Sequence, residues 1–353
     1  MKNSFSVIGL MSGTSLDGLD VAWCFFLKKD DRWLFEIKKA FTVEYPKELK
    51  TALSEAHYFS GNDLAKLNID LGRYYGKVVN EFIIRNEIEF FDFVASHGHT
   101  IFHQPQQGYT VQIGCPITLA AVARTMVIAD FRTLDVALGG QGAPLVPIGD
   151  KLLFANYAAC LNLGGFANVS MDIEGKRVAW DICPVNFVMN YYALQKRMPY
   201  DENGELARKG KINFPLLEKL ESLPFYDDPY PKSLGREWVE EYVFPLIDSF
   251  GLSIEEVLAT VVEHVALRIA FDLKEISGNV LVTGGGTFNS FLLDRMKELC
   301  NCCFVDSQPG IIDFKEALIF AFLGVLKARG EINVLSSVTG ASRDSCSGVV
   351  CEL

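Results

Sequence analysis

Short apolar runs separated by turn residues open the chain and predict three β-strands. Residues 4–11 are rich in Phe, Val and Ile, residues 19–27 follow a turn of Gly, Ser and Asp, and residues 34–43 alternate apolar with polar positions. Runs of this length and composition are typical of strands that are at least partly buried in a sheet. The chain therefore begins with three strands joined by short connections.

A helix and a further strand follow these three predicted strands. Ser60 with Asp63 suits a helix-capping box, and apolar residues between Leu64 and Phe82 recur at helical spacing. Residues 91–96 form a short apolar run that leads into a glycine turn. The first part of the chain is therefore predicted as three strands, a helix and a strand.

The same order of elements recurs further along the chain. Strands are predicted at residues 158–163, 167–173 and 177–182, and a helix follows at about residues 185–195. Ser253 then caps a second long helix, which leads into a strand that ends in three glycines. The repeat of a β-β-β-α unit predicts two facing sheets with helices outside.

The length of 353 residues also favours two domains, because one hydrophobic core rarely organises so long a chain. The predicted fold class is therefore α/β with two domains. The Gly- and Pro-rich stretch from Gly139 to Pro144 suits a crossing or hinge between them. We expect domain I to comprise residues 1–135 plus 335–353, and domain II to comprise residues 136–334.

An excess of acidic residues argues against nucleic acid and membranes as partners. The chain has 33 basic and 44 acidic residues, which leaves a formal charge of −11. A field of that sign repels phosphate backbones and anionic lipid surfaces. Any phosphate group that binds must then be held locally, by backbone N–H groups and a metal ion.

Cysteine usage and the N-terminus predict a cytoplasmic protein. The nine cysteines are odd in number and show no paired metal-binding spacing, so we expect free thiols in a reducing compartment. The apolar stretch near the N-terminus is too short for a secretion signal or a membrane span.

Three glycine-containing turns that follow predicted strands are candidate phosphate-binding segments. They span residues 11–18, 162–168 and 283–289. Small residues let backbone N–H groups approach phosphate oxygens, and Asp17 is a candidate to hold a Mg²⁺-bound water. None matches a P-loop or dinucleotide motif, and a single glycine turn is more often only a hairpin. Three such turns at equivalent places of a duplicated fold predict two phosphate clamps from opposite domains and a third turn near the nucleoside.

Six segments of the chain together resemble the anhydro-N-acetylmuramic acid kinase family. They read IGLMSGTSLDGLDVA, ASHGHTIFHQP, DFRTLDVALGGQGAPLVP, NLGGFANVS, LVTGGGTFNSF and DFKEALIFAFLGVL. The resemblance implies an actin-like ATPase fold of two RNase H-like units with a central cleft. It also implies a cytoplasmic, dimeric enzyme that uses ATP, Mg²⁺ and water to open 1,6-anhydro-N-acetylmuramic acid. The implied product is N-acetylmuramic acid 6-phosphate, formed during peptidoglycan recycling.

The resemblance also implies which residues form the active site. Asp181 corresponds to the catalytic aspartate, Glu316 to a second acidic residue of the site, and His97, Arg132 and Asn186 fall in segments that bind the sugar. Arg132 suits the lactyl carboxylate of the sugar, because a guanidinium group binds carboxylate bidentately. The candidate nucleotide-binding residues, from the resemblance and from the three turns, are Gly13, Thr14, Ser15, Leu16, Asp17, Gly18, Leu19, Asp20, Gly164, Gly165, Gly284, Gly285 and Gly286, with Asp17 as the candidate metal ligand.

Two segments depart from the family pattern. Where the family has D-T-G-P-G-N, this chain keeps the Asp, Pro and Asn but has Ile182, Cys183 and Val185 in place of the threonine and two glycines. His99 replaces the amide of the family's S-H-G-Q-T segment. The distinctive stretch from Pro231 to Glu237 has no role assigned from the sequence.

Simpler roles for these residues remain open. Asp181 would serve equally to end a strand, and Glu316 to complement the dipole of the helix that follows it. The spacing of His97, His99 and His103 suggests a metal site, but the three residues straddle a turn, which favours one ligand-facing histidine and two others.

Two rival functions also remain open. In the coupled reaction that the family resemblance implies, Asp181 acts as a general base on water, as in an inverting glycosidase. In an ordinary hexose kinase it would deprotonate a sugar hydroxyl and no water would be consumed. A non-enzymatic ATP switch on the same fold would need a further binding module, and only about twenty residues follow Val334.

Overall fold

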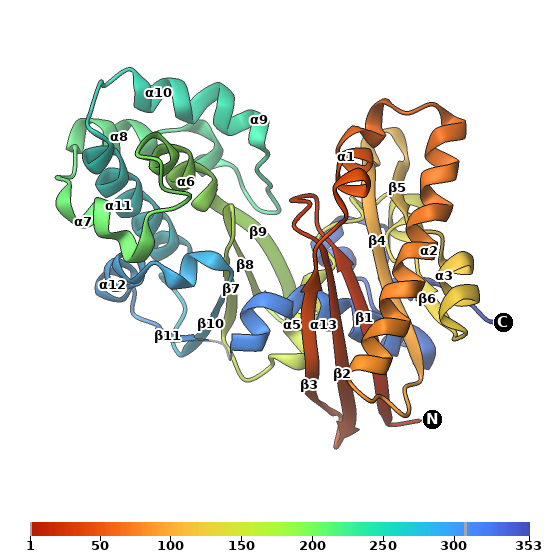
Figure 1. The fold of residues 1–353 in the computed structure, drawn as a ribbon. Coiled ribbons are helices and arrows are strands. Elements are labelled where there is room, and N and C mark those ends of the chain that lie inside the picture. Colours follow the sequence, from red (N-terminus) through yellow and green to blue (C-terminus); the bar gives the residue numbers. More distant parts are fainter. Residues whose placement is uncertain (1, 307–308) are drawn as a thin grey trace. The chain divides into compact units, whose positions relative to one another are not determined.

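The computed structural model describes residues 2–306 and 309–353. Two compact units account for the chain: unit 1 comprises Met1–Leu153 and Asp313–Leu353, and unit 2 comprises Phe154–Ile312. Each unit contains one β-sheet covered by helices (Figure 1).

The chain passes between the units at residues 153–154 and 312–313. The sequence prediction puts these crossings at 135–136 and 334–335 instead. The two assignments differ for residues 136–153 and 313–334, which the structure groups with unit 1 and the sequence prediction groups with domain II. The predicted domain bounds stay a prediction.

The sheet of unit 1 has seven strands in the order β12-β6-β4-β1-β2-β3, with β5 paired to β4. The strands are β1 (Ser4–Ser12), β2 (Leu19–Lys29), β3 (Arg32–Val43), β4 (Phe93–Gln104), β5 (Tyr109–Ile113), β6 (Val127–Ala129) and β12 (Val349–Cys351). The first three strands are antiparallel, whereas β4 runs parallel to β1 and β6 parallel to β4. The C-terminal strand β12 returns to pair with β6.

Helices cover both faces of this sheet. They are α1 (Lys47–Glu55), η1 (Ala56–Tyr58), α2 (Gly61–Arg85), η2 (Pro105–Gln107), α3 (Pro116–Ala123), α4 (Thr133–Ala137), α5 (Val146–Leu153), α13 (Pro309–Arg329) and α14 (Ser336–Thr339). Tyr75 of α2 and Leu119 of α3 pack in one buried cluster with Ile8 and Leu10 of β1. Helix α13 lies so close to β1 that a Cβ on Gly9 would be 2.2 Å from the carbonyl oxygen of Ala317, so glycine is required there.

The sheet of unit 2 repeats the order of the first. Its strands are β7 (Ala159–Leu163), β8 (Phe166–Ile173), β9 (Lys176–Pro184), β10 (Asn279–Thr283) and β11 (Cys303–Asp306), arranged as β11-β10-β7-β8-β9. Three antiparallel strands come first and two parallel strands follow, as in unit 1. The predicted fold class, α/β with two units built from a duplicated β-β-β-α order, is confirmed.

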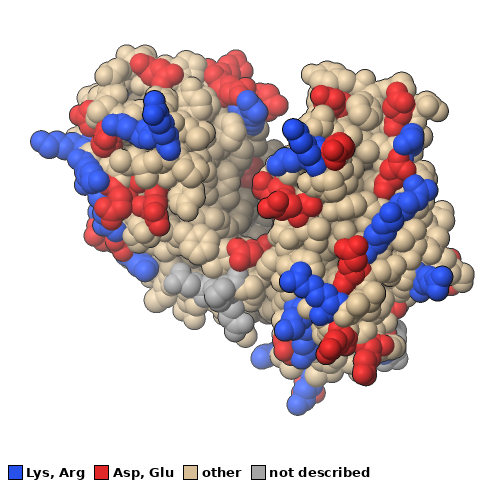
Figure 2. Space-filling view, in the orientation of Figure 1, with Lys and Arg blue, Asp and Glu red and all other residues tan. Residues whose placement is uncertain are grey.

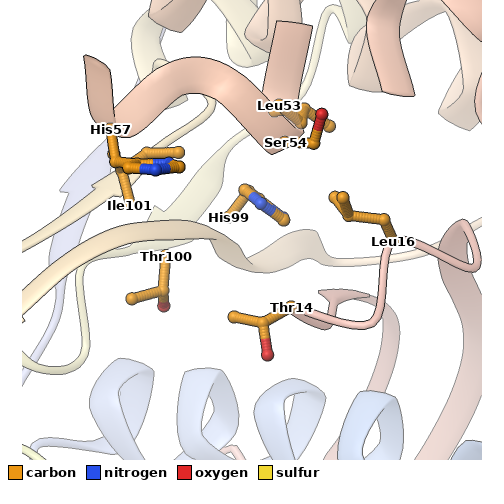
Figure 3. Close-up of a pocket in the computed structure, with 8 residues that line it drawn as sticks. All are labelled: Thr14, Leu16, Leu53, Ser54, His57, His99, Thr100 and Ile101. Carbon is orange, nitrogen blue, oxygen red and sulfur yellow. The ribbon is translucent and has the colours of Figure 1, made fainter. Parts of the chain in front are cut away.

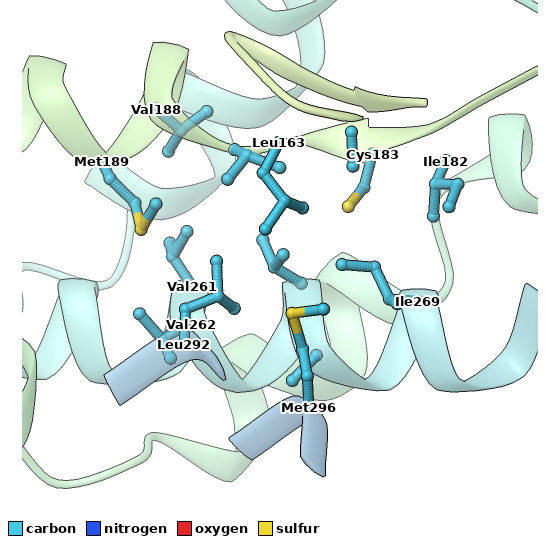
Figure 4. Packing of buried hydrophobic residues seen from close by; sticks show 14 of the residues in the cluster. Leu163, Ile182, Cys183, Val188, Met189, Val261, Val262, Ile269, Leu292 and Met296 are labelled. Atoms are coloured by element: carbon cyan, nitrogen blue, oxygen red, sulfur yellow. The ribbon is translucent and has the colours of Figure 1, made fainter. Parts of the chain in front are cut away.

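Unit 2 buries its core between this sheet and a long central helix. Its helices are α6 (Asn186–Gln195), η3 (Glu202–Gly204), α7 (Glu205–Lys209), α8 (Phe214–Glu221), η4 (Pro224–Asp227), α9 (Arg236–Trp238), η5 (Val239–Val243), α10 (Phe244–Asp248), α11 (Ile254–Asp272), η6 (Gly285–Phe288) and α12 (Ser290–Leu299). Figure 4 shows Val261, Val262 and Ile269 of α11 directed at Leu163 and Cys183 of the sheet. Helix α11 begins at Ser253 with a full capping box, as its sequence predicts.

The β-β-β-α elements predicted from periodicity agree with the structure to within about two residues at most ends. The strand predicted at residues 91–96 is longer, because β4 continues as far as Gln104. Strand β9 likewise continues to Pro184, so Asp181 lies inside the strand and does not end it. The short elements α1, α3, β5 and β6 were not predicted, since they carry too few residues for a periodic signal.

Charged side chains of both signs lie on the visible surface of the protein (Figure 2). On the face in Figure 2, basic side chains lie among acidic ones on both units. Among the residues that the structure describes, no helix is long and apolar enough to cross a bilayer. None of the nine cysteines, all of which lie in the described residues, forms a disulfide bond.

Candidate active site

The first candidate phosphate turn, residues 13–18, joins β1 to β2 and borders a hollow of about 430 Å³ in unit 1. The residues around this hollow are Gly13, Ser15, Asp17, Gly18, Asp20, Thr42, Asp313, Phe314 and Glu316. Five of the predicted nucleotide-binding residues and the predicted catalytic Glu316 therefore share one cavity. Thr14 and Leu16 point into a second hollow instead, and the side chain of Leu19 is fully buried in the core.

Two positions of this turn are occupied by glycine for different structural reasons. A Cβ on Gly13 would meet no protein atom closer than the Ser15 hydroxyl oxygen, at 3.4 Å. A Cβ on Gly18, whose φ is +157°, would lie 2.5 Å from the carbonyl oxygen of Val43. Gly18 is therefore required by packing, whereas Gly13 leaves open space beside its backbone. Such space fits a phosphate group, which backbone N–H groups approach closely only where no side chain intervenes.

Acidic side chains line the same hollow. Oδ1 of Asp20 accepts a hydrogen bond of 2.5 Å from the Thr42 hydroxyl. Burial raises the pKa of Asp20, and repulsion from Asp17 and Asp313 adds to the rise. Burial likewise raises the pKa of Glu316, whose side chain reaches the hollow. Within the described residues, no group of three or more potential ligands could hold a metal ion by itself. This donor set fits Mg²⁺, which takes one or two protein carboxylates and completes its shell with water and substrate phosphates.

Arg132 is held in place by two neighbours in unit 1. Its Nε donates to Nε2 of His97 at 3.0 Å, and its Nη1 donates to the carbonyl of Gly142 at 2.6 Å. The Nδ1 of His97 lies 2.9 Å from the carbonyl of Gly98 and donates to it in the tautomer that leaves Nε2 as acceptor. Both nitrogens of His97 are therefore occupied, and burial holds its pKa well below the ordinary value. The structure makes His97 a support for Arg132, and its predicted contact with the sugar stays a prediction.

The glycine-rich segment after α4 is tied down within unit 1. Oδ2 of the buried Asp135 accepts the N–H of Gly142 at 2.7 Å, and its Oδ1 accepts the Thr339 hydroxyl at 2.7 Å. The N–H of Gln141 donates to the carbonyl of Thr339. A Cβ on Gly140 would lie 2.2 Å from the Asp135 carboxylate, so this glycine is required by close packing.

A second hollow, of about 200 Å³, adjoins the phosphate turn (Figure 3). Its lining includes the imidazole of His99, which lies between His57 and Leu16 in this view. Nδ1 of His99 is 2.7 Å from the hydroxyl of Ser12, which also accepts a hydrogen bond from Tyr45. Burial lowers the pKa of His99 to about 4, so the ring is neutral at pH 7. The sequence marked His99 as a departure from the family pattern and as one of the closely spaced histidines His97, His99 and His103.

In unit 2, Asp181 lies on β9, an outer strand of the sheet, beside Asn168 of β8. Its N–H donates to the carbonyl of Lys232 at 2.9 Å, and its Oδ2 accepts the N–H of Leu234 at 2.8 Å. Burial raises the pKa of Asp181, and the hydrogen bond from Leu234 opposes the rise. Sequence reasoning missed Leu234, although the unassigned stretch from Pro231 to Glu237 contains it.

The other two glycine turns lie against one another in unit 2. A Cβ on Gly284 or on Gly286 would come within 2.7 Å of Leu163, at the start of the second turn. The Asn186 amide donates to the Leu163 carbonyl at 3.0 Å, and the N–H groups that open α6 bond to the carbonyls of residues 164 and 165. The structure thus brings Gly164, Gly165, Gly284, Gly285, Gly286 and Asn186 together at one place.

The three residues that replace the family's threonine and glycines are core residues here. Ile182, Cys183 and Val185 are at most 1% exposed and pack in the cluster formed with α11. Burial raises the pKa of the Cys183 thiol well above its ordinary value. These side chains therefore add packing beside Asp181 and contribute no exposed polar group to the site.

Comparison with known proteins identifies the family. Residues 5–352 match the family model described as anhydro-N-acetylmuramic acid kinase. The chain is 35% identical to the anhydro-N-acetylmuramic acid kinase of Shewanella sp. (strain ANA-3), with 98% of each chain covered. It is also 35% identical to that of Pseudomonas syringae pv. tomato, with 96% of each covered. Among solved structures, the chain is similar to the activator of 2-hydroxyisocaproyl-CoA dehydratase from Clostridium difficile, with a TM-score of 0.43. The two chains are 14% identical, and the similarity covers 92% of this chain and 97% of that chain. The chain belongs to the anhydro-N-acetylmuramic acid kinase family.

Proposed function

We propose that this protein is an ATP-dependent kinase that hydrolytically opens 1,6-anhydro-N-acetylmuramic acid and phosphorylates its O6. The product would be N-acetylmuramic acid 6-phosphate, for peptidoglycan recycling in the cytoplasm, and the enzyme would act as a homodimer. Membership of the family across residues 5–352 is the observation that carries the proposal.

The hollow of unit 1 would receive the phosphates of ATP. Its open backbone at Gly13 and the hydroxyl of Ser15 supply hydrogen-bond donors, and Asp17 and Asp20 would hold Mg²⁺ through oxygen or through bound water. Bound Mg²⁺ would neutralise charge on the transferring phosphoryl group. The glycine turns beside Asn186 in unit 2 would contact the remainder of the nucleotide.

Arg132 would bind the lactyl carboxylate of the sugar. His97 and Gly142 fix Nε and Nη1, which leaves Nη2 without a protein partner among the described residues. The guanidinium plane is therefore oriented before the substrate arrives, and less entropy is lost on binding. Glu316 lies near enough to Arg132 for their charges to interact, so it would help to set the orientation of this group.

Asp181 would act as the general base. It takes a proton from water as the water oxygen bonds to the anomeric carbon, and the bond from that carbon to O6 breaks. O6 then accepts the γ-phosphoryl group of ATP, with ADP as the leaving group. Phosphorylation of O6 removes the nucleophile that would otherwise close the ring again, which makes coupling of the two steps useful.

Reaction in ¹⁸O-water with purified enzyme, ATP and 1,6-anhydro-N-acetylmuramic acid tests this function. We expect the label at C1 of the sugar phosphate, no label in the phosphoryl group, and the α-anomer as first product, because attack must come from the face opposite O6. An unlabelled sugar phosphate, analysed before mutarotation exchanges the C1 oxygen, would instead indicate an ordinary hexose kinase. Label in inorganic phosphate would indicate an ATPase switch.

A further inference from the structure

Residues Tyr230–Arg236, which we call the strap, run beside the outer edge of β9 at Asp181. An outer strand leaves alternate backbone groups without a partner, and the strap supplies one, because the carbonyl of Lys232 accepts the N–H of Asp181. The next contact goes to the side chain: the N–H of Leu234 donates to Oδ2 of Asp181 at 2.8 Å. The strap therefore bonds both the backbone and the carboxylate of a single residue.

Three anchors hold the strap against unit 2. The ring of Tyr230 stacks on Trp180 at a centroid distance of 4.8 Å, and the Trp180 indole is itself fixed by a hydrogen bond to Asp272. The ammonium group of Lys232 donates to the carbonyl of Phe225 at 3.0 Å and lies over the ring of the same residue. The side chain of Leu234 packs against the core cluster of the unit.

The surface to which Lys232 attaches is itself rigidly built. The carbonyl of Tyr226 also accepts a hydrogen bond from Lys232. The hydroxyl of Tyr226 is hydrogen-bonded to Nε2 of the buried His264. His264 in turn pairs with Glu221, which also pairs with Arg268. The strap is therefore anchored to a connected polar network and is not a free loop.

The carboxylate of Asp181 is left with one committed oxygen and one free oxygen. Oδ2 is bonded to Leu234, and Oδ1 has no protein hydrogen-bond partner in the part of the chain that the structure describes. Of the other titratable groups, Cys183 on the same strand lies near enough to the Asp181 carboxylate for their charges to interact. A base whose plane is fixed presents one lone pair to the proton, whereas an unfixed carboxylate must be oriented in each turnover.

We propose that the strap is a positioning element for the reaction: the Leu234 amide holds Oδ2 of Asp181 so that Oδ1 receives the proton from water. This inference rests on the proposed role of Asp181 as the base. It gives a function to the stretch that the sequence marked as distinctive. Lys232 and Tyr230 are positioning residues that act through the Leu234 amide.

The test replaces the Leu234 amide by an ester, through incorporation of the corresponding α-hydroxy acid into the full chain. The leucine side chain is kept and only the N–H donor is lost. We expect kcat to fall about tenfold and the acidic limb of the kcat–pH profile to move to higher pH by about one unit, because a hydrogen bond to a carboxylate favours its charged form. The KM for ATP should not change.

The matched control is the same ester at Leu252, a leucine in a loop that packs against the same cluster and whose N–H has no protein partner among the described residues. That variant should keep the pH profile of the unmodified enzyme. Lys232→Met provides a second route, since it keeps a long unbranched side chain but removes the ammonium group that donates to Phe225 and lies over its ring. It should lower kcat and shift the acidic limb in the same direction.

Two outcomes would overturn the inference and are distinguishable. If the Leu234 ester and Lys232→Met variants melt at lower temperature but keep the kcat and pH profile, while Asp181→Asn is inactive, the strap is only structural and the base assignment stands. If Asp181→Asn retains normal kcat, the proposed base is wrong, and the positioning role is lost with it.

Discussion

The two sheets have the same strand order but place their acidic groups on different strands. In unit 1, Asp20 on the second strand pairs in register with Thr42 on the third. In unit 2, Asn168 on the second strand pairs with Asp181 on the third. Asp20 and Asn168 occupy equivalent positions on the second strand of each sheet. Each belongs to the second residue pair from the turn that joins the first two strands, since Met11 pairs with Asp20 and Asn162 with Asn168.

Under the proposed function, one architecture would support two kinds of chemistry. Burial raises the pKa of both acids, but Asp20 receives a hydroxyl donor from the neighbouring strand, whereas Asp181 receives a backbone N–H from a segment outside the sheet. Asp20 lies in an open hollow with other acids, which suits a cation. Among the described residues, Asp181 has one oxygen without a hydrogen-bond partner and no second acid bonded to it, which suits a base.

The largest effect should come from removing the base. Asp181→Asn keeps the size of the side chain and can still accept the Leu234 hydrogen bond, but it cannot take up the proton. We expect kcat to fall about 10²–10⁴-fold, equivalent to about 3–5 kcal/mol, with ATP affinity kept. Steady-state kinetics and calorimetric titration with ATP measure the two quantities.

Asn168→Asp is the matched control for this variant, because it adds an acid at the equivalent of Asp20 without removing Asp181. If the base must lie at the position of Asp181 on the third strand, Asn168→Asp combined with Asp181→Asn should not restore activity. Restored turnover in the double variant would show that an acid on the second strand of unit 2 can also act as the base.

Gly13→Val should weaken ATP binding at least tenfold, about 1.4 kcal/mol, because the new side chain fills space beside the turn. The fold should be kept, since the nearest protein atom to the new Cβ is 3.4 Å away. Calorimetric titration with ATP and a thermal melt provide the two measurements.

Gly18→Val is the contrasting variant in the same turn. Its Cβ would overlap the Val43 carbonyl, so it should lower the free energy of unfolding by about 1–3 kcal/mol. If Gly13→Val binds ATP normally, the phosphates are held elsewhere.

Asp20→Asn should raise the Mg²⁺ concentration needed for half-maximal activity about tenfold, because an amide oxygen is a weaker ligand for a hard cation. Thr42→Val removes only the hydroxyl donor to Asp20 and should raise the required Mg²⁺ concentration by a smaller factor. Activity measured against Mg²⁺ at saturating ATP gives the comparison. An unchanged requirement in Asp20→Asn would argue against a cation in this hollow.

The smallest effect should be on stability. A carboxyl group whose pKa is raised by folding destabilises the folded state above that pKa, and the penalty disappears below the ordinary value near 4. Asp181→Asn should therefore melt about 1–3 °C higher than the unchanged protein at pH 7–8, with the difference closing as the pH falls toward 4. Thermal melts at several pH values test this, and Asp20→Asn should behave in the same way. Equal melting temperatures at pH 8 would show that neither acid is strained by burial.

Much of the fold could be predicted from local patterns. Strand alternation, the Ser253 capping box and the recurrence of β-β-β-α depend on residues close in sequence, so periodicity reveals them. The glycine turns were likewise found from short motifs, and Asp181 was found from the family resemblance. The family resemblance supplied their proposed roles, which composition and spacing alone left open.

Tertiary structure decided the partners of these residues. Leu234 reaches Asp181 across 53 positions, and Arg132 reaches His97 across 35. Gly13 and Gly18 look equivalent in the sequence, because both are glycines of one turn. They differ in the folded protein, where space is open beside Gly13 and the Val43 carbonyl lies against Gly18. Local sequence determines which elements form, since backbone preference and amphipathicity act over a few residues. Which donor meets which carboxylate depends on contacts between distant segments, and these exist only once the sheets and helices have packed.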